Sequence, residues 1–286
     1  MTRGRCLITR NLTIPGLKAR KGGIPLTWIT AYDVLQAQVA EASQVDVILV
    51  GDSLGMTTLG YSTTLPVTVD DMIHHARAVR RGAPNTMMVV DLPFMSYALQ
   101  ADAVHAAGRV MQETEADAVK LEGGREVLAT VEHLVAFGIP VVGHLGLTPQ
   151  SVHEMGGYKV QAKTADTIRI LLQEAGALTA AGICALVLEG IPDRVAAEVT
   201  NSLPIPTIGI GAGPGVDGQV LVFHDCLGLS TAYPKFVRPF AQVRTAMTNG
   251  LTAYREAVQQ RHFPGPDQSY QIADAEWERH LADRGS

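Results

Sequence analysis

The sequence has little cysteine and no long apolar run. Its 286 residues include three cysteines, far apart and without a Cys-x-x-Cys pair: Cys6, Cys184 and Cys226. This spacing indicates neither a disulfide framework nor a zinc site, and it is typical of a protein from a reducing compartment. No apolar stretch approaches the roughly 18 residues that a helix needs to cross a bilayer. We therefore expect neither a disulfide scaffold nor a membrane span, and we expect a cytoplasmic protein.

The sequence also lacks an excess of basic residues. It carries 23 Lys and Arg against 28 Asp and Glu, a formal net charge of -5, which argues against a general nucleic-acid-binding surface. Residues 1–23 are an exception, because they are basic and contain no acidic residue. They lack the apolar segment of a secretion signal, although an organelle transit peptide stays an alternative. We expect residues 1–11 to form an N-terminal extension.

What the sequence does contain is a regular alternation of two patterns. Short apolar runs predict strands at 26–30, 47–50, 87–91, 118–122, 140–144, 185–189, 206–211 and 219–225. Amphipathic stretches predict helices at 34–43, 69–80, 101–115, 125–137, 164–181 and 192–202. Apolar strands that are each followed by a helix indicate a parallel sheet covered on both faces.

About eight such units without a linker predict an α/β fold, a (β/α)8 TIM barrel, as a single domain over residues 12–270. A doubly wound open sheet is the alternative. The polar residues 271–286 predict a C-terminal tail, either a marginal helical extension or a disordered segment.

Polar side chains follow the predicted strands where each strand ends. Five consecutive strands end on residues that ionise or donate hydrogen bonds: Asp52 with Ser53, Asp91, Lys120 with Glu122, His144, and Glu189. The carboxyl ends of barrel strands converge on one mouth, so these residues are expected to share one site. Each of them taken alone could instead be a helix cap or a solvated strand end.

Asp52 and Asp91 are the best candidates for metal ligands. Two carboxylates from neighbouring strands, with water at the remaining positions, suit Mg²⁺. Asp52 alone would more often be a helix cap. The pair His74 and His75 falls on a predicted helix and is expected to lie on the surface rather than to bind zinc.

Lys120 and Glu122 are two residues apart on one strand and therefore face the same side. A lysine directed into the barrel mouth needs an acidic partner or a bound anion. Either the two residues form an ion pair at a wet strand end, or Glu122 orients Lys120 toward a substrate carboxylate or oxyanion. His144 beside them is either a core histidine or a second donor to such an anion.

Glu189 follows five apolar residues and should be partly desolvated, which suits a carboxylate for proton abstraction. A third metal ligand or a salt-bridge partner is the alternative. Two glycine-rich stretches lie nearby. GPGVDG at 213–218 has the spacing of a dinucleotide-binding loop but precedes a strand-like segment, which argues against that function. EMGGYKVQ at 154–161 is interpreted as a mobile flap over the site.

Twelve motifs together carry a family resemblance. They are TAYD (30–33), LVGDSLGM (49–56), TLPVTVDDM (64–72), RRGAPN (80–85), DLPFMSY (91–97), VKLEGG (119–124), PVVGHLGLTPQSV (140–152), GGYKVQ (156–161), LVLEGIP (186–192), IGIGAG (208–213), DGQVLVFHD (217–225) and PKF (234–236). In this order and spacing, across about residues 12–270, they closely resemble the ketopantoate hydroxymethyltransferase family.

The resemblance implies a barrel of the phosphoenolpyruvate/pyruvate superfamily, dependence on Mg²⁺, and a homodecamer. It also implies transfer of a one-carbon unit from 5,10-methylenetetrahydrofolate to 3-methyl-2-oxobutanoate, giving 2-dehydropantoate and tetrahydrofolate in pantothenate biosynthesis. The implied roles are metal ligation by Asp52, Asp91 and Glu122, and catalysis by Glu189 as base. Substrate binding is implied for Asp52, Ser53, Asp91, Lys120 and His144.

Two other functions remain as alternatives. One is a lyase or mutase of the same superfamily that also stabilises an enolate with Mg²⁺. The other is a barrel that binds a 2-oxo acid without catalysis. No stretch of the sequence indicates where a folate would bind.

Overall fold

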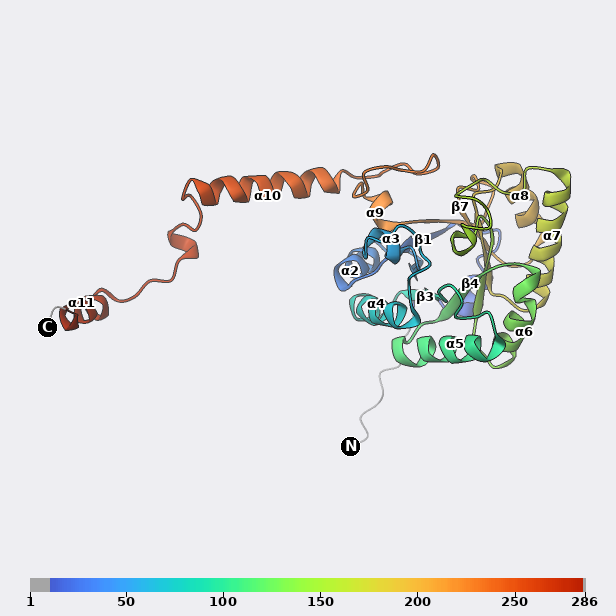
Figure 1. The fold of residues 1–286 in the computed structure, drawn as a ribbon, viewed down its shortest axis with the longest axis horizontal. Coiled ribbons are helices and arrows are strands. Elements are labelled where there is room, and N and C mark those ends of the chain that lie inside the picture. Colours follow the sequence, from blue (N-terminus) through green and yellow to red (C-terminus); the bar gives the residue numbers. More distant parts are fainter. Residues whose placement is uncertain (1–10, 285–286) are drawn as a thin grey trace, which may run out of the picture.

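The computed structural model describes residues 11–284 and contains a closed barrel of eight parallel strands. Neighbouring strands follow the order of the chain, and the last strand pairs with the first. Figure 1 shows the barrel with its surrounding helices. The strands are β1 (Leu26–Thr30), β2 (Val47–Val50), β3 (Met87–Asp91), β4 (Ala118–Glu122), β5 (Val141–Gly146), β6 (Ala185–Glu189), β7 (Thr207–Ile210) and β8 (Gly218–Leu221). The predicted barrel is thereby confirmed, and the open-sheet alternative is wrong.

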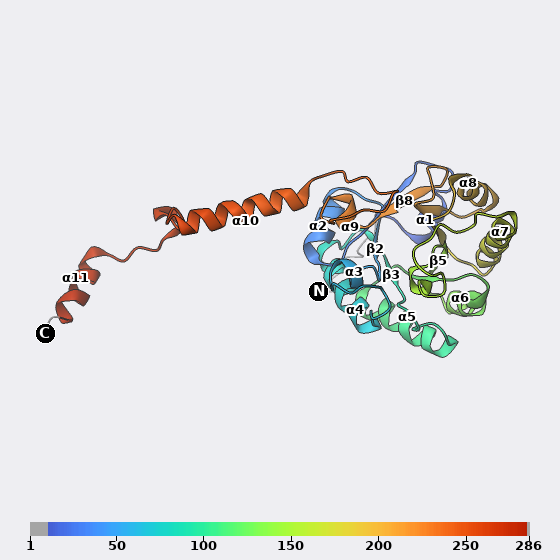
Figure 2. The same cartoon turned by 45° about the horizontal axis from the view of Figure 1, so that its top comes forward.

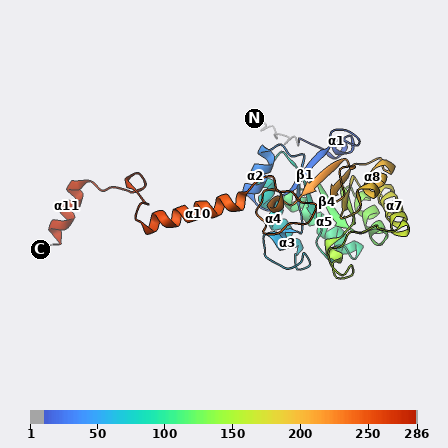
Figure 3. The same cartoon turned by 90° about the horizontal axis from the view of Figure 1, so that it is seen from above.

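Helices surround the barrel, and Figure 3 shows them from above. The longer ones are α2 (Val34–Ala42), α4 (Val69–Gly82), α5 (Gln100–Thr114), α6 (Leu128–Ala136), α7 (Ala165–Ala180) and α8 (Asp193–Ser202). Short helices are α1 (Ile14–Lys18), α3 (Leu54–Thr57) and α9 (Phe223–Cys226). Within the described residues, no helix is long and apolar enough to cross a membrane.

Polar side chains at the first residues of several of these helices explain where they begin. The Thr68 hydroxyl accepts from the amide of Asp71, whose carboxylate accepts from the amide of Thr68, and together they form a capping box at the start of α4. Thr164 and Thr167 form the same arrangement at α7. The loops before α4 and α7 therefore end at a defined residue, whereas α5, α6 and α8 begin without a side-chain cap.

The predicted strand at 219–225 is wrong in its second half. β8 ends at Leu221, and α9 begins two residues later. The amide of Phe223 donates to the side-chain hydroxyl of Thr30 at 2.9 Å, so it is satisfied without a strand partner. This contact turns the chain away from the sheet and into α9.

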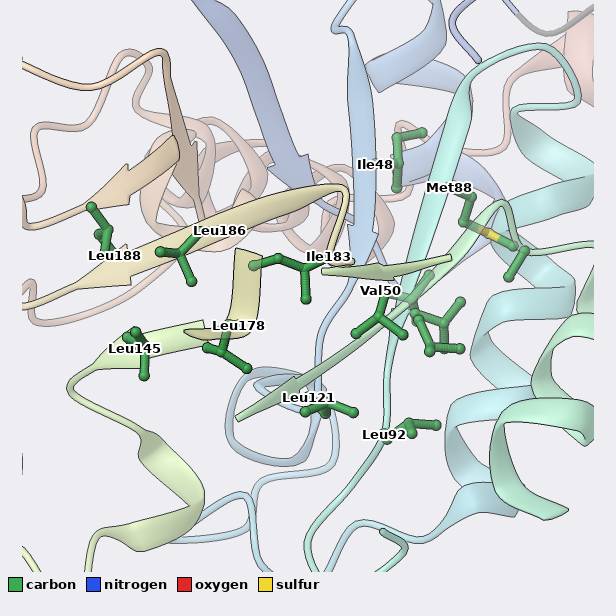
Figure 4. Close-up of a cluster of buried hydrophobic side chains, with 14 of the residues drawn as sticks. Ile48, Val50, Met88, Leu92, Leu121, Leu145, Leu178, Ile183, Leu186 and Leu188 are labelled. Atoms are coloured by element: carbon green, nitrogen blue, oxygen red, sulfur yellow. The ribbon is translucent and has the colours of Figure 1, made fainter. Parts of the chain in front are cut away.

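Side chains alternate between two apolar layers because successive residues of a strand face opposite sides. Val47 and Leu49 of β2 point into the barrel, whereas Ile48 and Val50 pack against the surrounding helices. Figure 4 shows part of this outer layer. The inward-facing positions continue to the carboxyl ends of the strands, where they carry the side chains of the site described below.

The C-terminal part of the chain leaves the barrel. Helix α10 (Val243–Gln259) and helix α11 (Asp274–Asp283) extend to one side in all three views (Figures 1, 2 and 3). Neither helix contains a buried residue. The tail predicted at 271–286 is helical over residues 274–283.

A groove on the barrel marks the place that a helix following β8 would cover. It has a volume of about 280 Å³ and is lined mainly by apolar side chains of α2, β1, β8 and α9. In a (β/α)8 barrel, each strand is followed by a helix that packs against the outer face of the sheet. Because α10 projects away instead, this part of the barrel wall stays uncovered within the described chain.

Candidate active site

The predicted site residues gather in one cavity at the carboxyl end of the barrel. Asp91, Lys120, Glu122, His144 and Glu189 each continue the inward-facing row of their strand, two or four residues beyond apolar inner-layer positions such as Val89 and Val187. The cavity has a volume of about 100 Å³. All seven predicted residues, including Asp52 and Ser53, line it.

Asp52 and Asp91 lie side by side because the turn after β2 brings their backbones close together. The amide of Asp52 donates to Oδ2 of Asp91 at 3.0 Å. A Cβ atom at Gly51 would lie 3.0 Å from Oγ of Ser53, so the missing side chain leaves room for the Ser53 hydroxyl beside Asp91. The Asp52 carboxylate accepts from Gln150 Nε2 at 2.8 Å rather than from the amides at the start of α3. The helix-cap alternative for Asp52 is therefore wrong.

Lys120 pairs with Asp91 and not with Glu122. Its Nζ atom lies 3.0 Å from Oδ1 of Asp91, and both side chains are buried. The strand register explains the choice, because Asp91 stands directly beside Lys120, whereas Glu122 stands beside His144. The predicted Lys120–Glu122 ion pair is thus replaced by two pairs across neighbouring strands.

His144 lies between two carboxylates. Its Nδ1 atom is 3.4 Å from Oε1 of Glu122, and its Nε2 atom is 3.3 Å from Oε2 of Glu189. Burial and the nearby Lys120 charge oppose protonation, but the two glutamates outweigh them and raise the pKa of His144 to about 9. Nζ of Lys120 also lies 3.3 Å from Nδ1 of His144, so the imidazole links Lys120, Glu122 and Glu189.

The cavity is lined by more acidic side chains than basic ones. Burial, together with Asp91 and Glu122, raises the pKa of Asp52 well above its ordinary value. Burial also raises the pKa of Asp91, although Lys120 opposes this shift. For Glu122, burial is outweighed by His144, Lys120 and the Gln150 amide, and its pKa is lowered. Four acidic side chains thus face two basic ones.

These residues fit a hard divalent cation held by two carboxylates. Oδ1 of Asp91 is buried, and within residues 11–284 it has no hydrogen-bond partner beyond its ion pair with Lys120. Mg²⁺ typically binds one or two protein carboxylates, with water and substrate in the other positions. Within residues 11–284, no three His, Cys, Asp or Glu side chains form a ready-made metal cluster. Both oxygens of Glu122 face other partners, His144 and the amide of Gln150.

Gln150 is a site residue that the sequence patterns did not reveal. It lies in the loop after β5 and is almost fully buried. Its side chain donates to Asp52 and to the carbonyl of Leu92, its amide donates to Glu122, and its Oε1 accepts from the Tyr97 hydroxyl. The only signal was its position six residues after His144, in a loop at the same mouth.

Tyr32 is a second residue that was not singled out. It follows β1, is fully buried, and shares a hydrogen bond of 2.8 Å with Ser53. Its carbonyl oxygen lies 2.6 Å from Nδ1 of His75. The prediction that both histidines lie on the surface is therefore wrong for His75, which is half-buried, and holds for the exposed His74.

Comparison with known proteins agrees with this architecture. The family model described as ketopantoate hydroxymethyltransferase matches residues 11–266. The chain belongs to this family.

Named relatives cover almost the whole chain. The 3-methyl-2-oxobutanoate hydroxymethyltransferase of Geobacillus sp. (strain WCH70) is 51% identical over 262 residues, which are 91% of this chain and 94% of the relative. The protein of the same name from Syntrophobacter fumaroxidans is 49% identical over 267 residues, 93% of this chain and 95% of the relative.

Solved structures of low sequence identity share the fold. A 2,3-dimethylmalate lyase, described as a member of the PEP mutase/isocitrate lyase superfamily, matches with a TM-score of 0.57 and 16% identity over 95% of this chain and 98% of its own. A phosphonopyruvate hydrolase in complex with oxalate and Mg²⁺ matches with a TM-score of 0.60 and 11% identity over 96% of each chain. These likenesses support the barrel architecture.

Proposed function

We propose that this ketopantoate hydroxymethyltransferase family member transfers a hydroxymethyl group to 3-methyl-2-oxobutanoate, with 5,10-methylenetetrahydrofolate as donor and 2-dehydropantoate as product. The observation that carries the proposal is the cavity at the barrel mouth, in which a carboxylate pair, a buried lysine and Glu189 surround a space for a small acid. We also propose that this activity belongs to pantothenate biosynthesis in the cytoplasm, as the family resemblance implies for the pathway and the few dispersed cysteines favour for the compartment.

In this proposal Asp52 and Asp91 hold Mg²⁺, and Glu122 belongs to the same set. The bound ion would act as a Lewis acid on a 2-oxo acid and make its C3 proton more acidic. Lys120, His144 and Ser53 would position the substrate carboxylate, since these three donors line the cavity beside the carboxylate pair. Gln150 holds the carboxylates of Asp52 and Glu122 in place.

Glu189 would be the base that removes the C3 proton. Its carboxylate lines the outer side of the cavity and is anchored by His144 at 3.3 Å. The donor would react as its iminium, formed when one of the two C–N bonds of its methylene carbon breaks and the released nitrogen takes a proton. The enolate carbon bonds to this methylene carbon as the electron pair of the C=N bond returns to nitrogen. Water then replaces the remaining nitrogen, its hydroxyl bonding to the carbon and its proton going to the nitrogen, so that a hydroxymethyl group and tetrahydrofolate result.

The direct test is an NMR assay of the purified protein with both substrates. We expect 2-dehydropantoate to form when MgCl₂ is present and not when EDTA removes it. In D₂O without folate, we expect deuterium to enter C3 of the 2-oxo acid. Absence of both signals would contradict the transferase proposal.

The same assay separates the two alternative functions. A lyase or mutase would break a carbon–carbon or carbon–phosphorus bond of its own substrate without folate. A barrel that only binds a 2-oxo acid would show binding by calorimetry and no exchange at C3. No contact in the cavity favours either alternative.

We also propose that the protein is a homo-oligomer, a decamer as the family resemblance implies. Helix α10 carries exposed apolar side chains along one face, at Met247, Leu251, Tyr254 and Val258. This spacing places them on one stripe of the helix. The uncovered groove of about 280 Å³ on the barrel is equally apolar.

The proposed occupant of this groove is α10 of a second copy. The start of α10 is held beside α9 by bonds from the amides of Val243 and Arg244 to the carbonyls of Leu227 and Gly228, and the helix then runs away from its own barrel (Figure 1). The substitution Leu251→Glu should therefore lower the mass measured by light scattering. Ala253→Glu, on the other side of α10, is the matched control and should keep it. An unchanged mass for Leu251→Glu would contradict this contact.

A further inference from the structure

A second cavity opens beside the site, and the steps proposed so far do not use it. It has a volume of about 790 Å³, compared with about 100 Å³ for the inner cavity. Its walls come from the segment 158–160, the loop after β6, the glycine loop after β7, and residues 234–236. We call it the outer cavity.

Glu189 is the one residue that lines both cavities. The transfer reaction requires two substrates to meet at the carbon from which the proton is removed. A donor bound in the outer cavity would approach that carbon from the side of the base. The volume lies within the roughly 300–1,000 Å³ that is typical of sites for ligands of drug size, whereas the inner cavity suits only a small acid.

The side chains of the outer cavity match the parts of a folate. Tyr158 and Phe236 expose 50% and 40% of their surface and offer aromatic faces for a fused heterocycle. Lys159 and Lys235 are exposed at the rim and, within residues 11–284, form no ion pair, so they are available to the carboxylates of a glutamate tail. The Asp193 carboxylate can accept from an amino-pyrimidinone edge of a pterin.

The glycine loop after β7 brings two of these side chains close to the barrel. A Cβ atom at Gly211 would lie 2.7 Å from the ring of Phe236, and one at Gly213 would lie 2.4 Å from Cβ of Asp193. Both glycines have positive φ angles, of 65° and 76°. The loop therefore packs directly against Phe236 and Asp193 and fixes the wall beside Glu189. Tyr158, from the segment 158–160, is held by a bond from its hydroxyl to the sulfur of Met56.

We propose that the outer cavity binds the folate donor, with its ring system between Tyr158 and Phe236 and its glutamate carboxylates at Lys159 and Lys235. This inference rests on the proposed function. It assigns the second substrate to a position from which its methylene carbon reaches the inner cavity past Glu189. The predicted flap at 154–161 contributes Tyr158 and Lys159 to this site.

The test measures KM for both substrates in variants of the outer cavity. For Phe236→Leu we expect the KM for 5,10-methylenetetrahydrofolate to rise roughly tenfold, because an aromatic contact is lost. For the double variant Lys159→Ala, Lys235→Ala we expect a rise of about fivefold that shrinks at high salt and grows with a polyglutamylated donor. The KM for the 2-oxo acid should change less than twofold in each case.

Matched controls are Phe137→Leu and Lys18→Ala, an exposed aromatic residue and an exposed lysine outside both cavities. The loss of folate-dependent turnover in Phe236→Leu should exceed the loss of folate-free C3 exchange at least tenfold, which a general folding defect would not produce. An unchanged folate KM in both outer-cavity variants would overturn the assignment while wild-type turnover still supported the proposed function. Absence of product from the wild-type protein would instead overturn the proposed function itself.

Discussion

The two ends of the barrel differ in how completely their charged side chains are paired. At the amino ends of the strands, each carboxylate meets a cation together with backbone amides or hydroxyls. Asp46 pairs with Arg20 and accepts from Thr27, and Asp217 pairs with Lys21 and accepts from the amide of Thr207. At the mouth, four acidic side chains face two basic ones, and within residues 11–284 an oxygen of Asp91 has no hydrogen-bond partner beyond its ion pair with Lys120.

This difference links the amino end of the barrel to stability and the mouth to function. A buried charge with a full set of partners contributes to the folded state, whereas an incompletely paired cluster costs free energy unless a ligand completes it. The amino end therefore holds the barrel closed, and the mouth is prepared for a cation and an acid. Substitutions at the two ends should have opposite consequences for activity and for stability.

The largest effect is expected for Glu189→Gln at the mouth. The amide keeps the shape of the side chain but cannot take a proton, so turnover should fall by roughly 10²–10⁴-fold. Calorimetry should still detect binding of Mg²⁺ and the 2-oxo acid, and deuterium should no longer enter C3. Undiminished exchange would remove Glu189 from the role of base.

The next largest effect is expected at the amino end, for Arg80→Met. The Arg80 side chain is buried at the end of α4, donates to the carbonyls of Ala83, Thr86 and Glu115, and pairs with Asp117 at 2.9 Å. Its removal takes the Arg80 ion pair from Asp117, which still accepts from the amide of Met88, and takes one donor from each of three backbone carbonyls. The free energy of unfolding should therefore fall by about 3 kcal/mol.

Urea denaturation measures this loss. The surface variant Arg169→Met, whose partner Asp166 is exposed, is the matched control and should change the free energy of unfolding by less than about 0.5 kcal/mol. Equal losses in the free energy of unfolding would show that the burial of Arg80 does not determine how much its contacts stabilise the fold.

A smaller effect of opposite sign is expected for Asp52→Asn at the mouth. Because burial and neighbouring carboxylates raise the pKa of Asp52, its ionised form opposes folding at neutral pH. In EDTA, the variant should be more stable than the wild type by about 1 kcal/mol, while the gain in stability on adding MgCl₂ should shrink. Thermal unfolding with and without Mg²⁺ measures both quantities.

Asp91→Asn is the contrasting variant. It removes the partner of the buried Lys120, so it should lose stability in EDTA as well as affinity for Mg²⁺. Equal changes in stability for the two variants would contradict the view that Asp91 forms an ion pair with Lys120 and that Asp52 forms no ion pair within residues 11–284.

The residues at the mouth could be predicted from the sequence, because their location depends on their position along single strands. Asp91, His144 and Glu189 each end an apolar run, Lys120 lies near the end of its strand, and the convergence of strand ends in a barrel places them together. The pairing of Lys120 with Asp91 could not be predicted in this way. It depends on the register between strands, which no pattern within one strand contains.

Three other features lay outside the reach of sequence patterns for different reasons. Gln150 occupies an irregular loop, where no periodicity shows that a polar side chain is buried. α9 has four residues, too few to show a helical period, so the sequence pattern predicted that its first residues continue the strand. The amphipathic stripe of α10 would look the same whether it covered its own barrel or another copy.

The smallest predicted effect concerns the pH dependence of Asp217 at the amino end. Burial opposes its ionisation, but Lys21 and the amides of Thr207 and Gly22 outweigh this and lower the pKa of Asp217. An acid with a lowered folded-state pKa stabilises the fold above its unfolded value of about 3.9, and this contribution is lost as the pH falls through the folded-state value. Asp217→Asn should therefore cost about 1 kcal/mol at pH 7 and progressively less below pH 4. Urea denaturation of both proteins at pH 7, 5 and 3 measures the difference, and a constant difference would show that shape rather than charge of Asp217 closes this end of the barrel.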